Sequence, residues 1–171
     1  MGTRIESYAL RDDGVVPNNP RLPLVLYPAA VPVADLAEAT RWFQGLFRSH
    51  GWRGIWVNGI FPFHHYHARS HEVLGIAQGT VKIQFGGPAG PVVNLSAGDA
   101  AIIPAGVGHC SIAASTDLSV VGAYPAGQED WDLKRATAAG RAVALTEIPK
   151  VPIPCQDPLF GIEGPLLGLW H

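Results

Sequence analysis

Apolar positions recur at helical spacing in only one long stretch of this chain, from Asp35 to His50. Ala39, Phe43, Leu46 and Phe47 would share one face of a helix there. Asp35, with Glu38 three residues later, resembles a capping box, so we expect the helix to begin at Asp35. Gly51 is a typical residue to follow a helix end. The pattern predicts one N-terminal helix, about residues 35–50, that packs against the core and carries no site.

Short apolar runs separated by turn residues follow from Trp52 onward. Their spacing of about 8 to 12 residues is typical of a sandwich or barrel. The strands predicted along the chain are 22–27, 55–57, 60–63, 72–77, 81–85, 92–95, 100–103, 108–113 and 118–124. The runs 72–77 and 81–85 flank Gln78-Gly79-Thr80, which predicts a hairpin. The C-terminal part is less regular, with a helix expected at 129–139 around Trp131 and Leu133.

Composition narrows the class of protein without assigning a function. Of the 171 residues, 47% are hydrophobic and 15% charged, and the net charge is -2 with no basic run. We therefore expect no nucleic acid and no membrane as partners. Cys110 and Cys155 are too far apart to suggest a disulfide scaffold, and the first residues form no apolar signal region. A cytoplasmic location is expected.

Candidate chemistry is concentrated in the segment 63–72, which holds four of the seven histidines. On a strand, His65 and His67 point to the same side, about 6 to 7 Å apart along the chain. A short turn after His67 would let Glu72 return to the same point. Two imidazoles and a carboxylate facing one ion form the open triad of non-heme iron sites, and Mn, Ni and Zn fit as well.

A second segment, 98–109, supplies a fourth candidate ligand. It reads as a turn at Gly98, an apolar strand, a tight turn shaped by Pro104 and Gly106, and a further strand that begins with His109. That turn would aim His109 into the barrel beside the first three residues. The predicted metal ligands are therefore His65, His67, Glu72 and His109.

The ligand set has two open alternatives, and two neighbouring side chains are expected to lie outside it. His71 would point away from the ion on a regular strand, but a bulge would exchange it with Glu72 as the ligand. His64 and Tyr66 have the opposite parity to His65, so we expect both to face away from the ion. The four predicted ligands could also be satisfied polar residues of a barrel that holds no metal, but a buried Glu among histidines is costly without an ion or a proton.

The two segments resemble the two motifs of the cupin family. Gly59, His65, His67, Glu72 and Gly79 match the first motif at its spacing, and Gly98, Pro104, Gly106 and His109 match the second. Ala113 replaces the Asn that usually ends the second motif. The strings His65–Gly75 and Asp157–Leu166 are similar to the YjlB-like subgroup. The resemblance implies a mainly β fold, a double-stranded β-helix of jelly-roll type, often dimeric, with one divalent metal ion (Fe, Mn, Ni or Zn) inside.

The resulting prediction is a single domain, residues 1–171, with a core barrel at about 52–125, the helix at about 35–50 and a C-terminal extension at about 126–171. The expected function is a metal-dependent enzyme on a small organic molecule, of the dioxygenase or oxidoreductase type. A metal-dependent isomerase or lyase, or a non-catalytic protein that binds a small ligand or metal, are the alternatives. The expected partners are a small-molecule substrate or ligand and a second copy in a homodimer; no catalytic residue is assigned.

Overall fold

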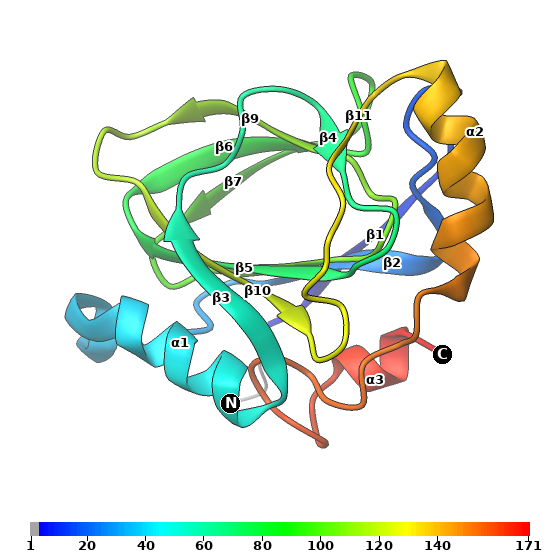
Figure 1. Cartoon of the computed structure of the whole chain (residues 1–171). Helices are drawn as coiled ribbons and strands as arrows, with labels where there is room; N and C mark the ends of the chain where they lie inside the picture. The colour runs from blue at the N-terminus through cyan, green and yellow to red at the C-terminus, as the bar shows by residue number, and fades with distance from the viewer. Residues whose placement is uncertain (1–3) are drawn as a thin grey trace.

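A computed structural model of the protein describes residues 4–171 (Figure 1). Its strands are β1 (Glu6–Leu10), β2 (Asn19–Tyr27), β3 (Trp52–Asn58), β4 (His65–Tyr66), β5 (Glu72–Gln78), β6 (Thr80–Phe85), β7 (Val92–Ser96), β8 (Ala100–Ile103), β9 (His109–Ala114), β10 (Ser119–Pro125) and β11 (Lys134–Arg135). Its helices are η1 (Val33–Glu38), α1 (Ala39–Ser49), α2 (Ala138–Glu147), η2 (Ile148–Lys150) and α3 (Leu166–Leu169).

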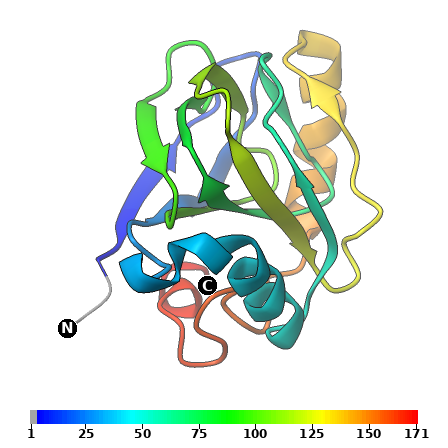
Figure 2. The ribbon, with the colours of Figure 1, turned by 90° about the vertical axis from the view of Figure 1, so that its left-hand side faces the viewer.

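The strands form two antiparallel sheets that face each other as a flattened barrel (Figures 1 and 2). One sheet has the order β1-β2-β8-β5-β10-β3, and the other has the order β11-β4-β9-β6-β7. The mainly β jelly-roll fold expected from the sequence is confirmed. The first sheet also includes β1 and β2, which lie outside the predicted 52–125 core.

Side-chain alternation divides the apolar residues of the six-stranded sheet between two faces. The residues facing the barrel interior pack against Val81, Ile83, Phe85 and Leu95 of the second sheet. They are Leu24, Leu26, Leu74, Ile76, Ala101, Ile103 and Val120. Their neighbours along the strands face outward and form a separate cluster with α1 and the C-terminal residues. Glu72 has the parity of Leu74 and Ile76, so it faces the interior.

Helix α1 covers the outer face of the six-stranded sheet and buries Ala39, Phe43 and Phe47. Close contact is possible because Gly75 has no side chain: a Cβ there would lie 2.6 Å from the Phe43 ring.

The predicted helix is confirmed, but it begins later than expected. Residues 33–38 form a 3-10 helix, and Glu38 makes no side-chain cap. Gly51 does follow the helix end, with a φ of 78°.

The hairpin predicted around Gly79 is wrong. Strand β5 pairs with β8 and β10, whereas β6 pairs with β7 and β9 in the other sheet. At Gly79 the chain passes from one sheet to the other with a φ of 75°, a conformation that glycine adopts without strain. Strands β5 and β6 are adjacent in sequence but do not pair with each other. The local sequence pattern does not reveal this, because it does not specify the partner of a strand.

The helix predicted at 129–139 is also wrong. Residues 129–133 form no helix, and α2 begins only at Ala138 with Thr137 as its N-cap. Tertiary contacts hold the earlier residues in an irregular segment. Trp131 stacks on Tyr124, and the Asp132 carboxylate accepts hydrogen bonds from the backbone N–H groups of Ala68 and Arg69. The predicted strand at 60–63 is absent too, because these residues form a bend before β4.

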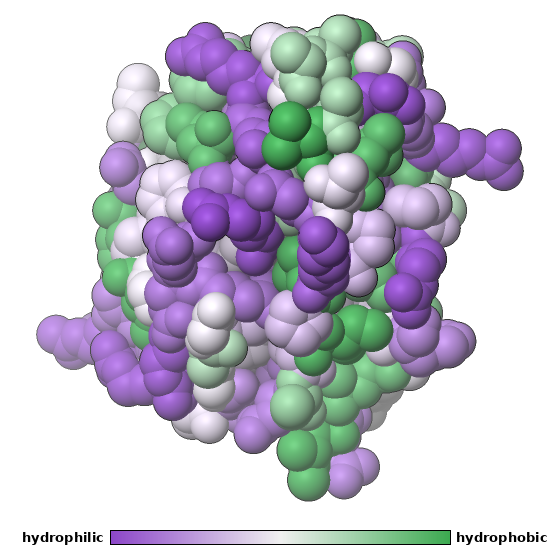
Figure 3. All heavy atoms as spheres, turned by 45° about the vertical axis from the view of Figure 1, so that its right-hand side comes forward, coloured by the Kyte–Doolittle hydropathy of each residue, from purple (hydrophilic) through white to green (hydrophobic). Residues whose placement is uncertain are grey.

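Helix α2 closes one end of the barrel over a third apolar cluster, and α3 lies on the same outer side of the six-stranded sheet as α1 (Figures 1 and 2). On the face shown in Figure 3, hydrophilic residues occupy the middle and hydrophobic residues form separate patches. Among the described residues, no helix has both the length and the apolar character that a membrane crossing requires.

Candidate metal centre

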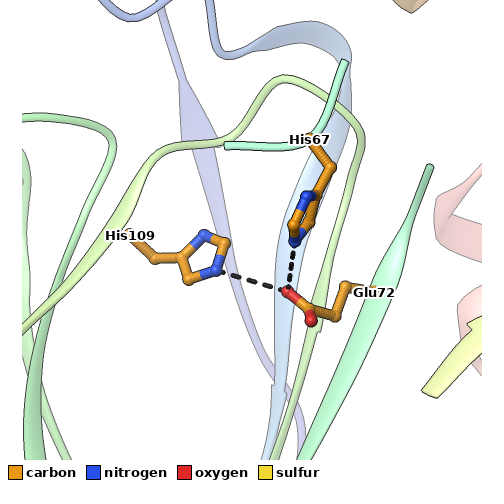
Figure 4. A group of neighbouring side chains, drawn as sticks. All are labelled: His67, Glu72 and His109. Carbon is orange, nitrogen blue, oxygen red and sulfur yellow. Dashed lines mark ion pairs between the residues drawn. The ribbon is translucent and has the colours of Figure 1, made fainter. Parts of the chain in front are cut away.

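Three of the four predicted ligands meet inside the barrel. One ligand atom from each of His67, Glu72 and His109 lies within 4.8 Å of the others, and all three residues are buried. The Nε2 atoms of His67 and His109 each lie 3.3 Å from Oε2 of Glu72. Figure 4 shows the two rings approaching the carboxylate from different segments, His67 from just after β4 and His109 from the start of β9. This arrangement can hold a metal ion, as the sequence predicted.

Local geometry brings the two ligand segments together. The turn before β9 places Gly106 at a φ of 90°, and its N–H donates to the carbonyl of His67 over 2.7 Å. A Cβ at Gly106 would lie 2.4 Å from the Asn18 carbonyl oxygen, so only glycine fits this position. Strand β4 then pairs His65 with His109. The predicted role of the Pro104–Gly106 turn in aiming His109 inward is consistent with these contacts.

Each histidine of the cavity is held through Nδ1 by a backbone carbonyl. His65 bonds Phe63 O at 2.9 Å, His109 bonds Val107 O at 3.2 Å, and His67 bonds Asp132 O. A carbonyl oxygen only accepts, so each Nδ1 carries the hydrogen and donates. The lone pair of each neutral ring is therefore on Nε2. Such outer contacts are typical of metal-binding histidines, because they fix the tautomer and the ring orientation.

The Glu72 carboxylate faces these lone pairs without a donor. Its Oε2 is buried and has no hydrogen-bond partner. Burial raises the pKa of a carboxyl, but the neighbouring His67 and His109 outweigh this and hold the pKa of Glu72 well below its usual range. Burial lowers the pKa of His67, yet Glu72 overcomes it and the net pKa is raised. Three acceptor atoms facing one point are stabilised by a positive charge, either a proton on an imidazole Nε2 or a metal ion, and a divalent ion fits this donor set.

His65 lies beside the three-residue group without being part of it. Its ring centre is 4.1 Å from that of His109 and 6.1 Å from that of His67, and it lines the same cavity. Burial and the neighbouring His109 lower the pKa of His65 to about 3, so its ring is neutral at ordinary pH. Its role as a fourth ligand stays a prediction.

The neighbouring residues point elsewhere. His71 is buried on the opposite side of β5, where its Nδ1 accepts from the backbone N–H of Ala105 at 2.8 Å and its ring packs on Trp170. The structure therefore brings Glu72 and not His71 to the histidine pair. Tyr66 is buried in the cluster beneath α2, away from the group. His64 is half-buried and does not line the cavity.

The predicted site did not include the aromatic residues around the group. Tyr124 from β10 is buried beside Glu72, and its hydroxyl accepts from Nε1 of Trp56 at 3.1 Å. Burial, together with the Glu72 charge, raises the pKa of Tyr124 above its ordinary range. Trp131 packs on both His67 and Tyr124 at 5.4 and 5.9 Å between ring centres. No local pattern marks these residues, because they reach the site from three separate segments.

Asp132 allows a test of the hydrogen bond that orients His67. One oxygen of its side chain, Oδ1, accepts from the N–H groups of both Ala68 and Arg69, at 2.9 and 3.0 Å. These bonds fix the position of Asp132, whose own backbone carbonyl binds His67. We expect Asp132→Ala to weaken metal binding about tenfold, because His67 loses its fixed orientation. Equilibrium dialysis against Zn²⁺ measures this.

The matched control is Asp132→Asn, which keeps Oδ1 and loses only the ion pair with Lys134. It should bind metal within about twofold of the unaltered protein. Equal losses in the two variants would contradict the role given to the Oδ1 contacts.

Comparison with known proteins agrees with this geometry. The family model described as "Cupin domain" matches residues 53–121, which contain all four predicted ligands. The chain is 39% identical over 170 residues to the uncharacterized protein YjlB of Bacillus subtilis (strain 168), covering 99% of each sequence. The chain therefore belongs to the cupin superfamily and, within it, to the YjlB-like group.

Solved structures match this chain only at low identity and low TM-score. Procruciferin, an 11S globulin from Brassica napus, is 13% identical with a TM-score of 0.39 over 68% of this chain and 23% of its own. Acireductone dioxygenase from Bacillus anthracis, with a cadmium ion in its active center, is 17% identical with a TM-score of 0.40 over 56% of this chain and 64% of its own. This chain thus spans under two thirds of either protein, and neither similarity carries an activity over to it.

Proposed function

We propose that this cupin is a metal-dependent enzyme acting on a small organic molecule, of the oxidoreductase or dioxygenase type. His67, Glu72 and His109 hold one divalent ion, with His65 as the fourth ligand. The observation that supports this most strongly is the buried Oε2 of Glu72, which lies 3.3 Å from two imidazole nitrogens and has no donor. Fe, Mn, Ni and Zn all suit this donor set.

The cavity lining favours oxidation at the ion over acid–base chemistry. A bound ion supplies a Lewis acid and, where it is redox-active, a centre for oxidation. Among the described residues that line the cavity there is no Lys, Ser or Cys, and Tyr124 is the only hydroxyl. The other residues position a molecule and exclude water. The Tyr124 hydroxyl beside Glu72 could hold a proton, which makes an isomerase or lyase the second candidate.

Metal content and oxygen uptake test the proposal. The protein is purified from unsupplemented cells, its metal is measured by mass spectrometry, and turnover of a panel of phenols and enols is followed with and without air. We expect about one ion per chain and oxygen uptake that is lost in His65→Ala. A metal-free protein contradicts the proposal. Turnover that proceeds equally without air favours the isomerase or lyase, and bound metal with no turnover favours the binding protein.

Metal affinity should fall as the pH falls. The metal binds neutral imidazole, so protons compete with it. Because the Glu72 charge raises the pKa of His67 in the metal-free protein, this competition begins at a higher pH than for an ordinary histidine. We expect the apparent affinity for Zn²⁺ to drop about tenfold for each pH unit below the pKa of His67. Dialysis between pH 8 and pH 5 measures it; a constant affinity would contradict the assignment.

The homodimer and the cytoplasmic location remain part of the proposal. Sedimentation of the purified protein tests the first, and fractionation of cells that produce the chain tests the second. A monomer over the whole concentration range would overturn the dimer without affecting the metal site.

A further inference from the structure

The cavity in front of Glu72 has a volume of about 470 Å³, within the range of small-molecule sites. Its innermost residues are the histidines and Glu72, and apolar or aromatic side chains form most of the rest. These are Trp56, Val57, Ile60, Phe61, Pro62, Leu74, Tyr124 and Trp131. Apart from the exposed Asn58 and the polar atoms of the Trp and Tyr side chains, the polar side-chain atoms therefore gather at the metal end, and the body of a bound molecule meets a mostly apolar wall.

No Lys or Arg lines this cavity within residues 4–171. The cationic side chains near it are engaged elsewhere. Arg53 donates to the carbonyls of Arg48 and Trp52, and Arg135 lies over the Phe63 ring at 3.8 Å. Lys134 lies 3.5 Å from both Asp132 and Glu147. A second anionic group on a ligand would thus be buried without a partner, which is costly.

The charge at the metal end also limits the charge that a bound molecule can carry. A divalent ion with one carboxylate ligand and neutral imidazoles leaves a net charge of about +1. This balances one negative group on a ligand. A dicarboxylate would add two charges to a cavity that offers no other cation.

Flat aromatic walls border the opening. The rings of Tyr124 and Trp131 stack at an angle of 19°. Trp56 is held over Gly122, where a Cβ would lie 2.1 Å from its ring, and it bonds the Tyr124 hydroxyl. Trp131 and Phe61 are still 42% and 47% exposed. A planar ligand would cover this aromatic surface and gain stacking contacts.

We propose that the cavity binds a flat, conjugated molecule with one polar or singly charged group directed at the metal end, and rejects small dicarboxylates. This inference rests on the proposed function for the role of the ion, but the recognition by the apolar walls does not need the ion. Binding and metal content can therefore be tested separately on the same sample.

The experiment uses 2-naphthol as the probe and oxalate as its contrast, titrated calorimetrically into protein of measured metal content. We expect 2-naphthol to bind and oxalate to bind at least tenfold more weakly. Trp131→Ala should weaken 2-naphthol binding at least tenfold. The matched control is Leu133→Ala, because Leu133 is also 42% exposed in the same segment but does not line the cavity. It should leave the affinity unchanged.

Each outcome separates the two proposals. Binding of 2-naphthol that depends on Trp131, in protein without metal, supports this inference and contradicts the proposed function. Oxalate binding equal to or tighter than 2-naphthol, in metal-loaded protein, overturns this inference and leaves the metal site intact. Binding of 2-naphthol that both variants leave unchanged also overturns it, because the probe then lies elsewhere.

Discussion

Glu72→Gln is expected to abolish metal binding while leaving the metal-free protein at least as stable. The amide has the size of the carboxylate, and its NH2 can donate to the Nε2 atoms of His67 and His109, which face Oε2 at 3.3 Å. The variant loses the one negative charge among the ligands. We expect the affinity for Zn²⁺ to fall at least 100-fold, about 2.7 kcal/mol.

Thermal unfolding with and without Zn²⁺ measures both effects at once. Added metal should raise the unfolding temperature of the unaltered protein and not that of Glu72→Gln, since a ligand stabilises only the state that binds it. Glu6→Gln is the control, because Glu6 lies on β1 in an ion pair with Arg4, away from the cavity. If Glu72→Gln still gained stability from metal, the central role of this carboxylate would be wrong.

Asp157→Ala is expected to lower the free energy of unfolding by about 3 kcal/mol. The side chain is fully buried and accepts four hydrogen bonds. They come from the Tyr27 hydroxyl at 2.5 Å and from the backbone N–H groups of Leu159, Phe160 and Leu166 at 2.8, 3.2 and 3.1 Å. Removing the carboxylate leaves these donors buried without partners. The C-terminal segment would then detach from β2, to which Asp157 joins it.

Urea denaturation measures this loss. Asp12→Ala removes a carboxylate that pairs with Arg141 at the surface, and it should cost under about 1 kcal/mol. Tyr27→Phe removes one of the four donors, so we expect an intermediate cost of about 1 kcal/mol. Equal losses for Asp157→Ala and Asp12→Ala would show that the C-terminal segment does not depend on this contact.

The residues that meet as a candidate metal group were predictable because their spacing has direct geometric meaning. Alternation along an extended segment puts His65 and His67 on one side and Tyr66 on the other, and the structure keeps this division although β4 is only two residues long. Glycine and proline in the turn before His109 indicated the change of direction. The Asp157–Leu166 string was recognisable as a pattern, but its role was not. The hydrogen bond to Tyr27 joins residues 130 positions apart.

The sequence by itself determined the apolar face of α1, most of the strands and three residues that meet as a candidate metal group, because each depends on the spacing of neighbouring residues. Only the tertiary structure decided which strands pair, that β5 and β6 lie in different sheets, and that residues 129–133 form no helix. It alone brought Trp56, Tyr124 and Trp131 around Glu72. These features depend on contacts between distant segments, where burial and hydrogen bonding outweigh local preference.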